Sequence, residues 1–250
     1  MQFSKYESTG NDFILVDNRV EEFPISISRI SSLCHRKFGI GADGLILLGE
    51  SEKSDFSMRI FNSDGSEAES CGNGLLCLGK FILDLGFPEQ KYRIELLKEV
   101  VEIDCKNEGF SIHLNDPQKI AVEEDVYLID TGVPHAVIFV DSDYDFMRVG
   151  KRTREEYNVN VNFVSLGEKI CVRTFERGVE GETFGCGTGA AAVASILALF
   201  KGHSSPLSLH FPGGELMVSF QTEGGGISHL TLSGIPSFVY SGQIEVPIQV

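Results

Sequence analysis

Cys71-Gly72-Asn73-Gly74 and Cys186-Gly187-Thr188-Gly189 are two copies of one short motif, and each opens a run of residues that is predicted to be a helix. The first copy follows Arg59-Ile60-Phe61, with its cysteine 12 residues after the arginine. The second copy follows Arg173-Thr174-Phe175 at a distance of 13 residues. Because the spacing agrees within one residue, the two halves of the chain are predicted to be related.

A third pair of segments extends the repeat toward the N-terminus, since Gly10–Asp17 is echoed by Gly132–Asp141. A period this long, present only twice, is typical of two related domains that face each other, whereas a solenoid needs at least about three shorter repeats. We therefore predict a pseudo-symmetric protein. Its N-terminal domain comprises residues 1–115 plus 235–250, and its C-terminal domain comprises residues 116–234.

The composition is that of a folded enzyme rather than of a nucleic-acid or membrane protein. Hydrophobic residues make up 42% of the 250 residues, which is enough to form a core. The formal net charge is −15, and no basic patch is present to neutralise phosphates. The longest apolar run, residues 190–200, is short beside the roughly 20 residues of a transmembrane helix. The N-terminus lacks a signal-peptide pattern, so we expect a cytoplasmic protein.

The six cysteines are predicted to be thiols rather than a disulfide framework, because a reducing compartment favours thiols. Neither Cys-x-x-Cys nor a Cys/His zinc spacing occurs, so no metal is expected. The four cysteines outside the repeated motif are expected to be small buried hydrophobic residues.

Hydrophobic patterning predicts an α+β fold in which a mostly antiparallel sheet curls around one central helix in each half. Helices are expected over residues 28–37, 74–85 and 188–201. Strands are expected in the first half over residues 2–6, 13–17, 45–48, 56–61, 92–97, 100–105 and 110–114, and in the second over 126–130, 136–141, 162–165, 170–175, 207–210, 215–221 and 229–233.

The repeated motif has a chemical logic. A thiol at a helix N-terminus meets the positive end of the helix dipole and unpaired N–H groups, which lower the thiol pKa from about 8.5. Glycines after the cysteine allow the same N–H groups to approach a carboxylate. One copy alone is better explained as a tight turn before a buried helix with an inert cysteine. Two copies at matching positions favour a catalytic role for the cysteines.

Two acid/base groups on opposite sides of a substrate are the minimum needed to invert a stereocentre, since one removes a proton and the other delivers one. Two symmetry-related thiols supply this pair without a cofactor. We therefore predict a cofactor-independent epimerase or racemase, and the resemblance described next implies that its substrate is a small amino acid.

Eight ordered segments carry a resemblance to the diaminopimelate epimerase family, and together they cover essentially the whole chain. They are Gly10-Asn11-Asp12-Phe13, Gly39-Ile40-Gly41-Ala42-Asp43-Gly44, residues 59–66, Cys71-Gly72-Asn73-Gly74, Gly132-Val133-Pro134-His135, Asn160-Val161-Asn162-Phe163, Glu176-Arg177-Gly178 and Cys186-Gly187-Thr188-Gly189. The resemblance implies a pseudo-dimeric fold with the active site between the domains. It also implies interconversion of LL- and meso-diaminopimelate, a step in lysine and peptidoglycan synthesis, and it allows a homodimer.

The resemblance implies a role for each matching residue. Cys71 and Cys186 would be thiolate base and thiol acid, exchanging roles with the direction of the reaction. The carboxylate at the reacting carbon would be held by the helix-end amides of Gly72, Asn73, Gly187 and Thr188. Asn11 would lie near the reacting amino acid group. The far carboxylate would be bound by Asn62, Asn160 and Arg177.

Two further residues would act on the thiols or on the substrate ammonium. Glu176 would accept a hydrogen bond from an ammonium or poise Cys186, and His135 would poise Cys71. Without the resemblance, the asparagines are adequately explained by turn hydrogen bonds. Glu176 and Arg177 could equally be a solvated charge pair, and His135 could cap a strand.

Two departures from the family pattern concern substrate choice. Val133 stands where the family usually has asparagine, and Gly44 replaces a residue that is usually polar. Losing a hydrogen bond to the far amino group relaxes discrimination, so we expect that glutamate is also accepted. The alternatives are a proline racemase or hydroxyproline epimerase of the same architecture, and a non-catalytic amino-acid-binding protein. Arg177 disfavours the first, and retention of both cysteines disfavours the second.

Overall fold

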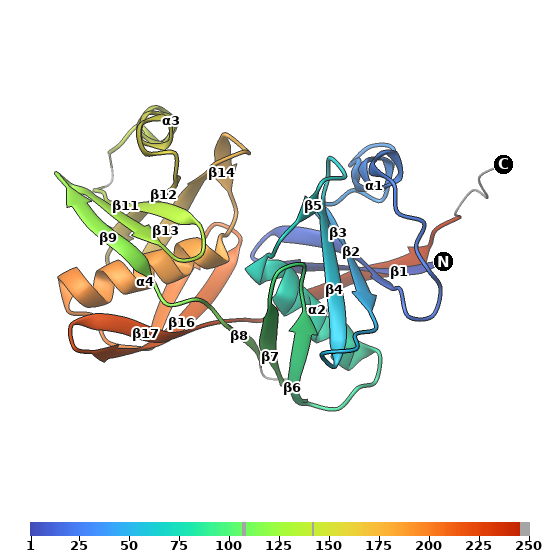
Figure 1. Cartoon of the computed structure of the whole chain (residues 1–250). Coiled ribbons are helices and arrows are strands. Elements are labelled where there is room, and N and C mark those ends of the chain that lie inside the picture. The colour runs from blue at the N-terminus through green and yellow to red at the C-terminus, as the bar shows by residue number, and fades with distance from the viewer. Residues whose placement is uncertain (107–108, 142, 246–250) are drawn as a thin grey trace. The chain divides into compact units, whose positions relative to one another are not determined.

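The computed structural model describes residues 1–106, 109–141 and 143–245. The chain forms two compact units, which are described separately (Figure 1). Unit 1 comprises Met1–Ile112 together with the segment that begins at Ile235, and unit 2 is His113–Gly234. Residues 246–250, which the sequence assigns to the N-terminal domain, lie outside the described residues.

Unit 1 contains two helices and a sheet that begins and ends with distant segments of the chain. Its elements are β1 (Gln2–Ser8), β2 (Asn11–Asp17), α1 (Ile27–Cys34), β3 (Gly44–Gly49), β4 (Phe56–Asn62), β5 (Glu67–Ala68), α2 (Gly72–Asp84), β6 (Gln90–Glu95), β7 (Val100–Lys106), β8 (Gly109–His113) and β18 (Ser237–Gln243).

Unit 2 repeats this plan element by element. Its elements are β9 (Gln118–Glu123), β10 (Val126–Asp130), β11 (Pro134–Phe139), α3 (Phe146–Tyr157), β12 (Asn160–Leu166), β13 (Ile170–Glu176), β14 (Gly181–Thr183), α4 (Gly187–Lys201), β15 (Leu207–Phe211), β16 (Gly214–Glu223) and β17 (Gly226–Gly234).

The two sheets have the same strand order and the same pattern of directions. Strands pair in the order β18-β1-β2-β3-β4-β6-β7-β8 in unit 1 and β9-β10-β11-β12-β13-β15-β16-β17 in unit 2. Parallel pairs occur at β2–β3 and β4–β6, and at the equivalent β11–β12 and β13–β15. The other described pairs are antiparallel, which confirms the predicted α+β class.

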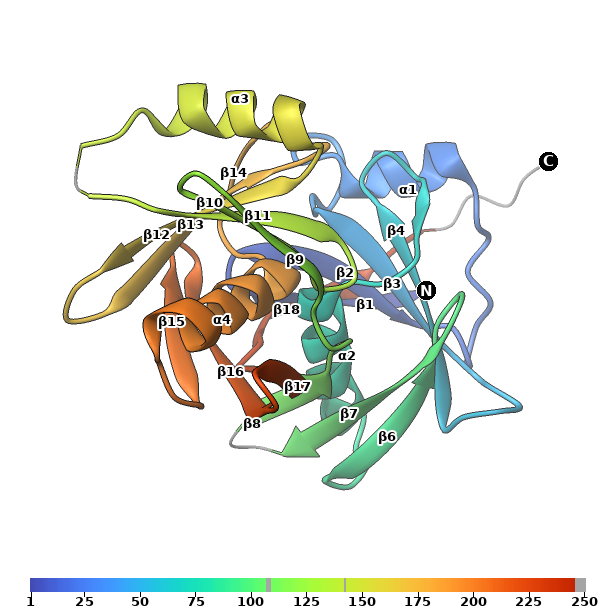
Figure 2. The same ribbon diagram turned by 60° about the vertical axis from the view of Figure 1, so that its left-hand side comes forward.

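A buried helix lies at the centre of each unit, as Figure 2 shows for α2 and α4. In α4, the residues from Gly189 to Leu197 are buried without interruption, and the hydrophobic pattern extends around the helix. A helix that is apolar on all sides is stable only when protein surrounds it. Helix α2 packs against β1, β2 and β7, and α4 against β17, β16 and β11. Each sheet therefore curls around its own helix.

The strand registers extend the repeat to single residues. Ile46 pairs with Ile60 between β3 and β4, and Asn162 pairs with Thr174 between β12 and β13. The arginines of the repeated segments occupy the same position in both units, where Arg59 binds Glu67 with two N–H donors and Arg173 binds Glu182 likewise. These forked ion pairs hold the β4–β5 and β13–β14 hairpins that lead to the two cysteines.

The structure corrects the sequence-based predictions in three respects. Cys171 is exposed rather than buried, because it alternates with buried Val172 along β13. Helix α1 ends at Cys34 rather than at residue 37, because His35 adopts an extended conformation. Helix α3 and strands β5, β9, β14 and β18 are not among the predicted elements. In the described part of the chain, no helix is both long and apolar enough to cross a membrane.

Candidate active site

Each repeated cysteine is the N-cap residue of the central helix of its unit. Cys71 precedes α2 and Cys186 precedes α4, both with extended backbone conformations. The first main-chain helical bond is made to the cysteine carbonyl, by Leu75 N–H in α2 and by Ala190 N–H in α4. The amides before those donors, including those of the four motif residues predicted to bind a carboxylate, are therefore outside the helical ladder.

In unit 1, the Cys71 thiol faces a fixed acceptor. Its Sγ lies 3.7 Å from Oδ1 of Asn11. The Asn11 Nδ2 donates to Oδ2 of Asp43 at 2.9 Å, so the carbonyl end of the amide is directed at the thiol. The prediction that Asn11 lies near the reacting group stays a prediction, but the structure brings it to Cys71.

Asp43 is held in turn by an ionic cluster. Arg36 binds both Asp43 and Asp12, and buried Lys5 pairs with Asp12 at 2.7 Å. Burial raises the pKa of Asp12, but hydrogen bonds from Arg36 and Lys5 outweigh it and lower that pKa to about 2. Asp12 is therefore charged at every pH at which the protein would work, and the cluster is a rigid support for Asn11.

The other predicted residues of unit 1 differ in their surroundings. Asn73 is buried, and its Oδ1 has no hydrogen-bond partner among the described residues. Asn62 is exposed and donates to Ser66 Oγ at 3.0 Å. Gly44 pairs with Asn62, and a Cβ at Gly44 would lie 2.5 Å from the Phe61 carbonyl oxygen. The backbone therefore has no room for a side chain at residue 44.

In unit 2, the Cys186 side chain contacts a backbone N–H group, a hydroxyl group and a carboxylate. Gly189 N–H donates to its Sγ at 3.4 Å, and Thr188 Oγ1 lies 3.6 Å from the same sulfur. The Glu176 carboxylate is hydrogen-bonded to the Cys186 side chain. Burial raises the pKa of Glu176, while hydrogen bonds from Thr183 and Cys186 oppose the rise. Glu176 is thus in hydrogen-bond contact with Cys186, and its role in poising that thiol stays a prediction.

His135 is fully buried, and its ring contacts two residues of its own unit. Nε2 lies 3.0 Å from Thr188 Oγ1, and Nδ1 lies 3.0 Å from Asn162 Nδ2. Burial, reinforced by the nearby charge of Arg177, lowers the pKa of His135 to about 3. The ring is therefore neutral. Its predicted action on Cys71 stays a prediction, whereas its contact with Thr188 connects it to Cys186.

Two of the three residues predicted to bind the far carboxylate meet in unit 2. Buried Asn160 accepts a 2.9 Å hydrogen bond from the backbone N–H of Arg177. The Arg177 guanidinium donates from Nη1 to the Asn158 carbonyl at 2.8 Å. Asn62 belongs to unit 1, so its part in such a site stays a prediction.

Asn162 and Thr174 are buried polar residues that the sequence reasoning did not select. Asn162 lies on β12, which pairs with the His135 strand, and Thr174 lies on β13, the next strand of the sheet. Thr174 Oγ1 donates to Asn162 Oδ1 at 2.9 Å. A signal was present, because an asparagine in the middle of an apolar strand needs a hydrogen-bond partner.

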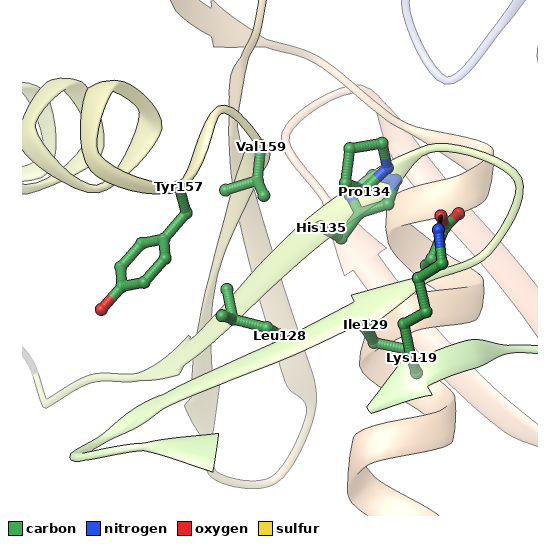
Figure 3. Close-up of a pocket in the computed structure, with 8 residues that line it drawn as sticks. Lys119, Leu128, Ile129, Pro134, His135, Tyr157 and Val159 are labelled. Atoms are coloured by element: carbon green, nitrogen blue, oxygen red, sulfur yellow. Dashed lines mark ion pairs between the residues drawn. The ribbon is translucent and has the colours of Figure 1, made fainter. Parts of the chain in front are cut away.

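A pocket of about 290 Å³ lies in unit 2 beside these residues. Its lining comes from Lys119, β10, the start of β11, and the Tyr157–Val159 region (Figure 3). His135 is the one predicted site residue that lines it within the described chain. The pocket is therefore adjacent to the candidate site and distinct from it. Within the described residues, no group of three or more His, Cys, Asp or Glu side chains could hold a metal ion.

We expect Gly189→Ala to be more damaging than Gly74→Ala, although the two glycines occupy equivalent positions. A Cβ at Gly189 would lie 2.5 Å from Asn162 Oδ1, whereas the nearest atoms to one at Gly74 would be the flexible ends of Ile46 and Ile60 at 3.1 Å. The crowding at Gly189 should lower the free energy of unfolding by about 1–3 kcal/mol. Urea unfolding of both variants measures the difference, and equal losses would contradict this packing.

His135 should make stability fall in mild acid. Its folded-state pKa of about 3 lies below the ordinary value of about 6.5, so the unfolded chain binds a proton that the folded chain refuses between those pH values. The free energy of unfolding should decrease as pH falls below about 6.5, by up to about 1.4 kcal/mol per pH unit. Urea unfolding at pH 7, 6 and 5 should show a weaker pH dependence in His135→Gln. Parallel curves for the two proteins would exclude this role.

Comparison with known sequences places the chain in one family. The family model described as diaminopimelate epimerase matches residues 3–120 and 127–233. A diaminopimelate epimerase from Flavobacterium psychrophilum is 36% identical over 256 residues, covering 98% of this chain and 100% of the relative. One from Methanothrix thermoacetophila is 38% identical and covers 89% of this chain and 90% of the relative.

Solved structures share the fold at low sequence identity. A Bacillus anthracis phenazine biosynthesis protein of the PhzF family has a TM-score of 0.80 at 15% identity, covering 98% of this chain and 99% of its own. A probable proline racemase from Agrobacterium radiobacter has a TM-score of 0.72 at 15% identity, covering 98% and 93%. At such identities the likeness is one of fold alone. The sequence match over nearly the full length is more specific, and by it the chain belongs to the diaminopimelate epimerase family.

Proposed function

We propose that the protein is a cofactor-independent epimerase that interconverts LL- and meso-diaminopimelate. The observation that carries the proposal is the repeated half-site, in which each unit places a cysteine at the N-cap of its buried central helix. Membership of the family supports the substrate. The activity would serve lysine and peptidoglycan synthesis in the cytoplasm, and a homodimer stays an expectation from the family resemblance.

The reaction needs one thiolate and one thiol on opposite faces of the substrate. One sulfur takes the Cα proton and becomes a thiol, and the electron pair left on the carbon is delocalised into the neighbouring carboxylate. The other thiol then gives its proton to the opposite face. Amides of Gly72, Asn73, Gly187 and Thr188 would hold that carboxylate and stabilise its growing charge.

Polar neighbours would set the state of each thiol. Glu176 would receive or return the proton of Cys186, which its raised pKa favours. Asn11 would accept a hydrogen bond from the Cys71 thiol. The action of His135 on Cys71 rests on the family resemblance, whereas its ring contacts are with Thr188 and Asn162 of its own unit.

The far end of the substrate would be recognised by Arg177 with Asn160 and Asn62. A guanidinium suits a carboxylate because it can donate two parallel hydrogen bonds to it. A substrate without a distal carboxylate would therefore not supply the proposed partner of Arg177. This disfavours the proline racemase and hydroxyproline epimerase alternatives. The two thiols disfavour a protein that only binds an amino acid.

Val133 is proposed to relax selectivity toward glutamate. It follows Gly132 as Asn11 follows Gly10, but its side chain can neither donate nor accept a hydrogen bond. Val133→Asn is the suitable test variant, because a side chain at Gly44 would collide with the Phe61 carbonyl.

Chiral chromatography of reduced protein with LL-diaminopimelate, L-glutamate and L-proline tests the proposal. We expect conversion of diaminopimelate, slower conversion of glutamate, and no conversion of proline. Val133→Asn should lower the glutamate rate relative to diaminopimelate. No change in L-glutamate after long incubation would contradict the relaxed selectivity. No change in diaminopimelate would contradict the proposed epimerase activity.

A further inference from the structure

A chain of hydrogen bonds in unit 2 connects the interior of the sheet to Cys186. It begins at Thr174 Oγ1, 2.9 Å from Asn162 Oδ1, and continues from Asn162 Nδ2 to His135 Nδ1 at 3.0 Å. From His135 Nε2 it reaches Thr188 Oγ1 at 3.0 Å, and Thr188 Oγ1 lies 3.6 Å from Cys186 Sγ. Thr174, Asn162 and His135 are each fully buried.

The Ala136 carbonyl fixes the direction of every bond in this chain. It lies 3.1 Å from Asn162 Nδ2 and can only accept, so the amide nitrogen must be on that side. The same nitrogen therefore donates to His135 Nδ1, which cannot carry a proton. The neutral ring must carry its proton on Nε2 and donate it to Thr188 Oγ1. The Thr188 hydroxyl is then left to donate toward the sulfur of Cys186.

The other half of the repeat shows that packing alone does not require these polar residues. The strand registers give the equivalent positions in unit 1. His135 corresponds to Phe13, Asn162 to Ile46, and Thr174 to Ile60. All three are buried hydrophobic residues around an equivalent helix. Unit 2 thus carries a connected polar chain where the same architecture is stable with an apolar core.

We propose that Asn162 and Thr174 are positioning residues that hold the Thr188 hydroxyl as a hydrogen-bond donor to Cys186. A fixed donor stabilises the thiolate more than the thiol, and it acts without a change of charge in the chain. The proposal deepens the proposed function, because it assigns the thiolate of one half-site a dedicated donor. Gly189 belongs to the same arrangement, since its lack of a Cβ lets α4 approach the Asn162 amide.

Other charged groups also act on Cys186 and must stay constant in a test. Glu176 on β13 is hydrogen-bonded to its side chain, and the Arg177 charge is near His135. The informative variants therefore change Thr174 alone. Thr174→Val keeps the shape and removes the hydroxyl, whereas Thr174→Ser keeps the hydroxyl and removes a methyl group.

The rate of alkylation by iodoacetamide should be measured for Cys186 between pH 5 and 10, by mass spectrometry of its tryptic peptide. Exposed Cys171 lies on a separate tryptic peptide and serves as the internal standard. We expect Thr174→Val to move the midpoint of the Cys186 curve upward by about one pH unit, a roughly tenfold loss of rate below the midpoint. Thr174→Ser should keep the original midpoint, as should Ile60→Val at the equivalent position of unit 1.

A purely structural role for Thr174 predicts a different pattern. Equal midpoints for Thr174→Val and the native protein, or equal shifts for the Val and Ser variants, would overturn the proposal. The alkylation measurement needs no substrate, so its outcome is independent of the diaminopimelate assay. With an active enzyme, the acid limb of kcat/KM should move with the alkylation curve.

A second measurement needs no variant of Thr174. Long-range 1H–15N spectra, with the His135 signals assigned by their loss in His135→Gln, report which ring nitrogen carries the proton. We expect the neutral form protonated on Nε2 from pH 5 to 9. Protonation on Nδ1 would reverse the chain and overturn the proposal.

Discussion

Replacing Cys71 or Cys186 by alanine should each abolish epimerisation of diaminopimelate, with a loss of about 10⁴-fold in kcat. A single remaining thiol can remove or return a proton on one face only, so inversion has no donor on the other face. Each variant should still exchange the Cα proton of one stereoisomer with solvent, and the two variants should differ in which isomer they exchange. Chiral chromatography and deuterium uptake measure the two effects.

Cys171→Ala is the matched control for both variants. Cys171 is exposed and outside the repeated motif, so its removal should leave kcat within about twofold. If either motif cysteine could be replaced with a similarly small effect, the two-thiol mechanism would be wrong.

Arg177→Met should lower kcat/KM for diaminopimelate by about 10²–10³-fold, mostly through KM. The guanidinium is oriented by the Asn158 carbonyl, and the backbone beside it is held by Asn160. Its loss would leave the far carboxylate of the substrate without a charged partner. Arg177→Lys should recover only part of the loss, because an ammonium cannot make the paired contact. Steady-state kinetics with the three proteins measure this effect.

Arg154 provides the matched control for Arg177. Arg154 lies on α3 and pairs with Glu180 at 2.8 Å. Glu180 is in the same β13–β14 loop as Arg177. Arg154→Met removes an equal charge from the same region, so the general electrostatic effect is reproduced. We expect a change below about twofold in KM. An equal loss in both variants would mean that Arg177 acts through the loop rather than on the substrate.

The repeated motif was sufficient to predict most of the fold. The cysteine-glycine pair marks the N-terminus of both helices. Helix α4 begins one residue before its predicted start, and α2 begins two residues before. The alternation of branched residues similarly predicted the strands that surround each helix. These signals are local, so they can be read without knowing the tertiary structure.

Helix α3 shows where local signals were too weak. Its buried face consists of Phe146, Gly150 and Thr153, of which only the first is strongly hydrophobic. The Asp145 cap and the many helix-forming residues were present, but the helical period was carried by small side chains. Strand β9 was missed for a related reason, since its side chains are exposed along the whole strand.

The sequence selects candidate site residues by type, but it does not give the partners of their side chains. The sequence selected His135 and Thr188 separately, yet their 3.0 Å contact depends on the way β11 and α4 meet. Asn162 and Thr174 are not among the predicted site residues, because their pairing across β12 and β13 is a tertiary feature that the sequence does not show. The strand register shows that their positions are equivalent to those of Ile46 and Ile60 in unit 1.

The central claim, a two-thiol inversion without a cofactor, is tested most directly by the fate of the Cα proton in a single conversion. Reduced enzyme should be incubated with LL-diaminopimelate in D2O, and the reaction stopped while little product has formed. We predict that the meso product carries deuterium at the inverted carbon, whereas the remaining LL substrate keeps its proton. A product that retains the substrate proton would show that one group serves both faces and would contradict the account.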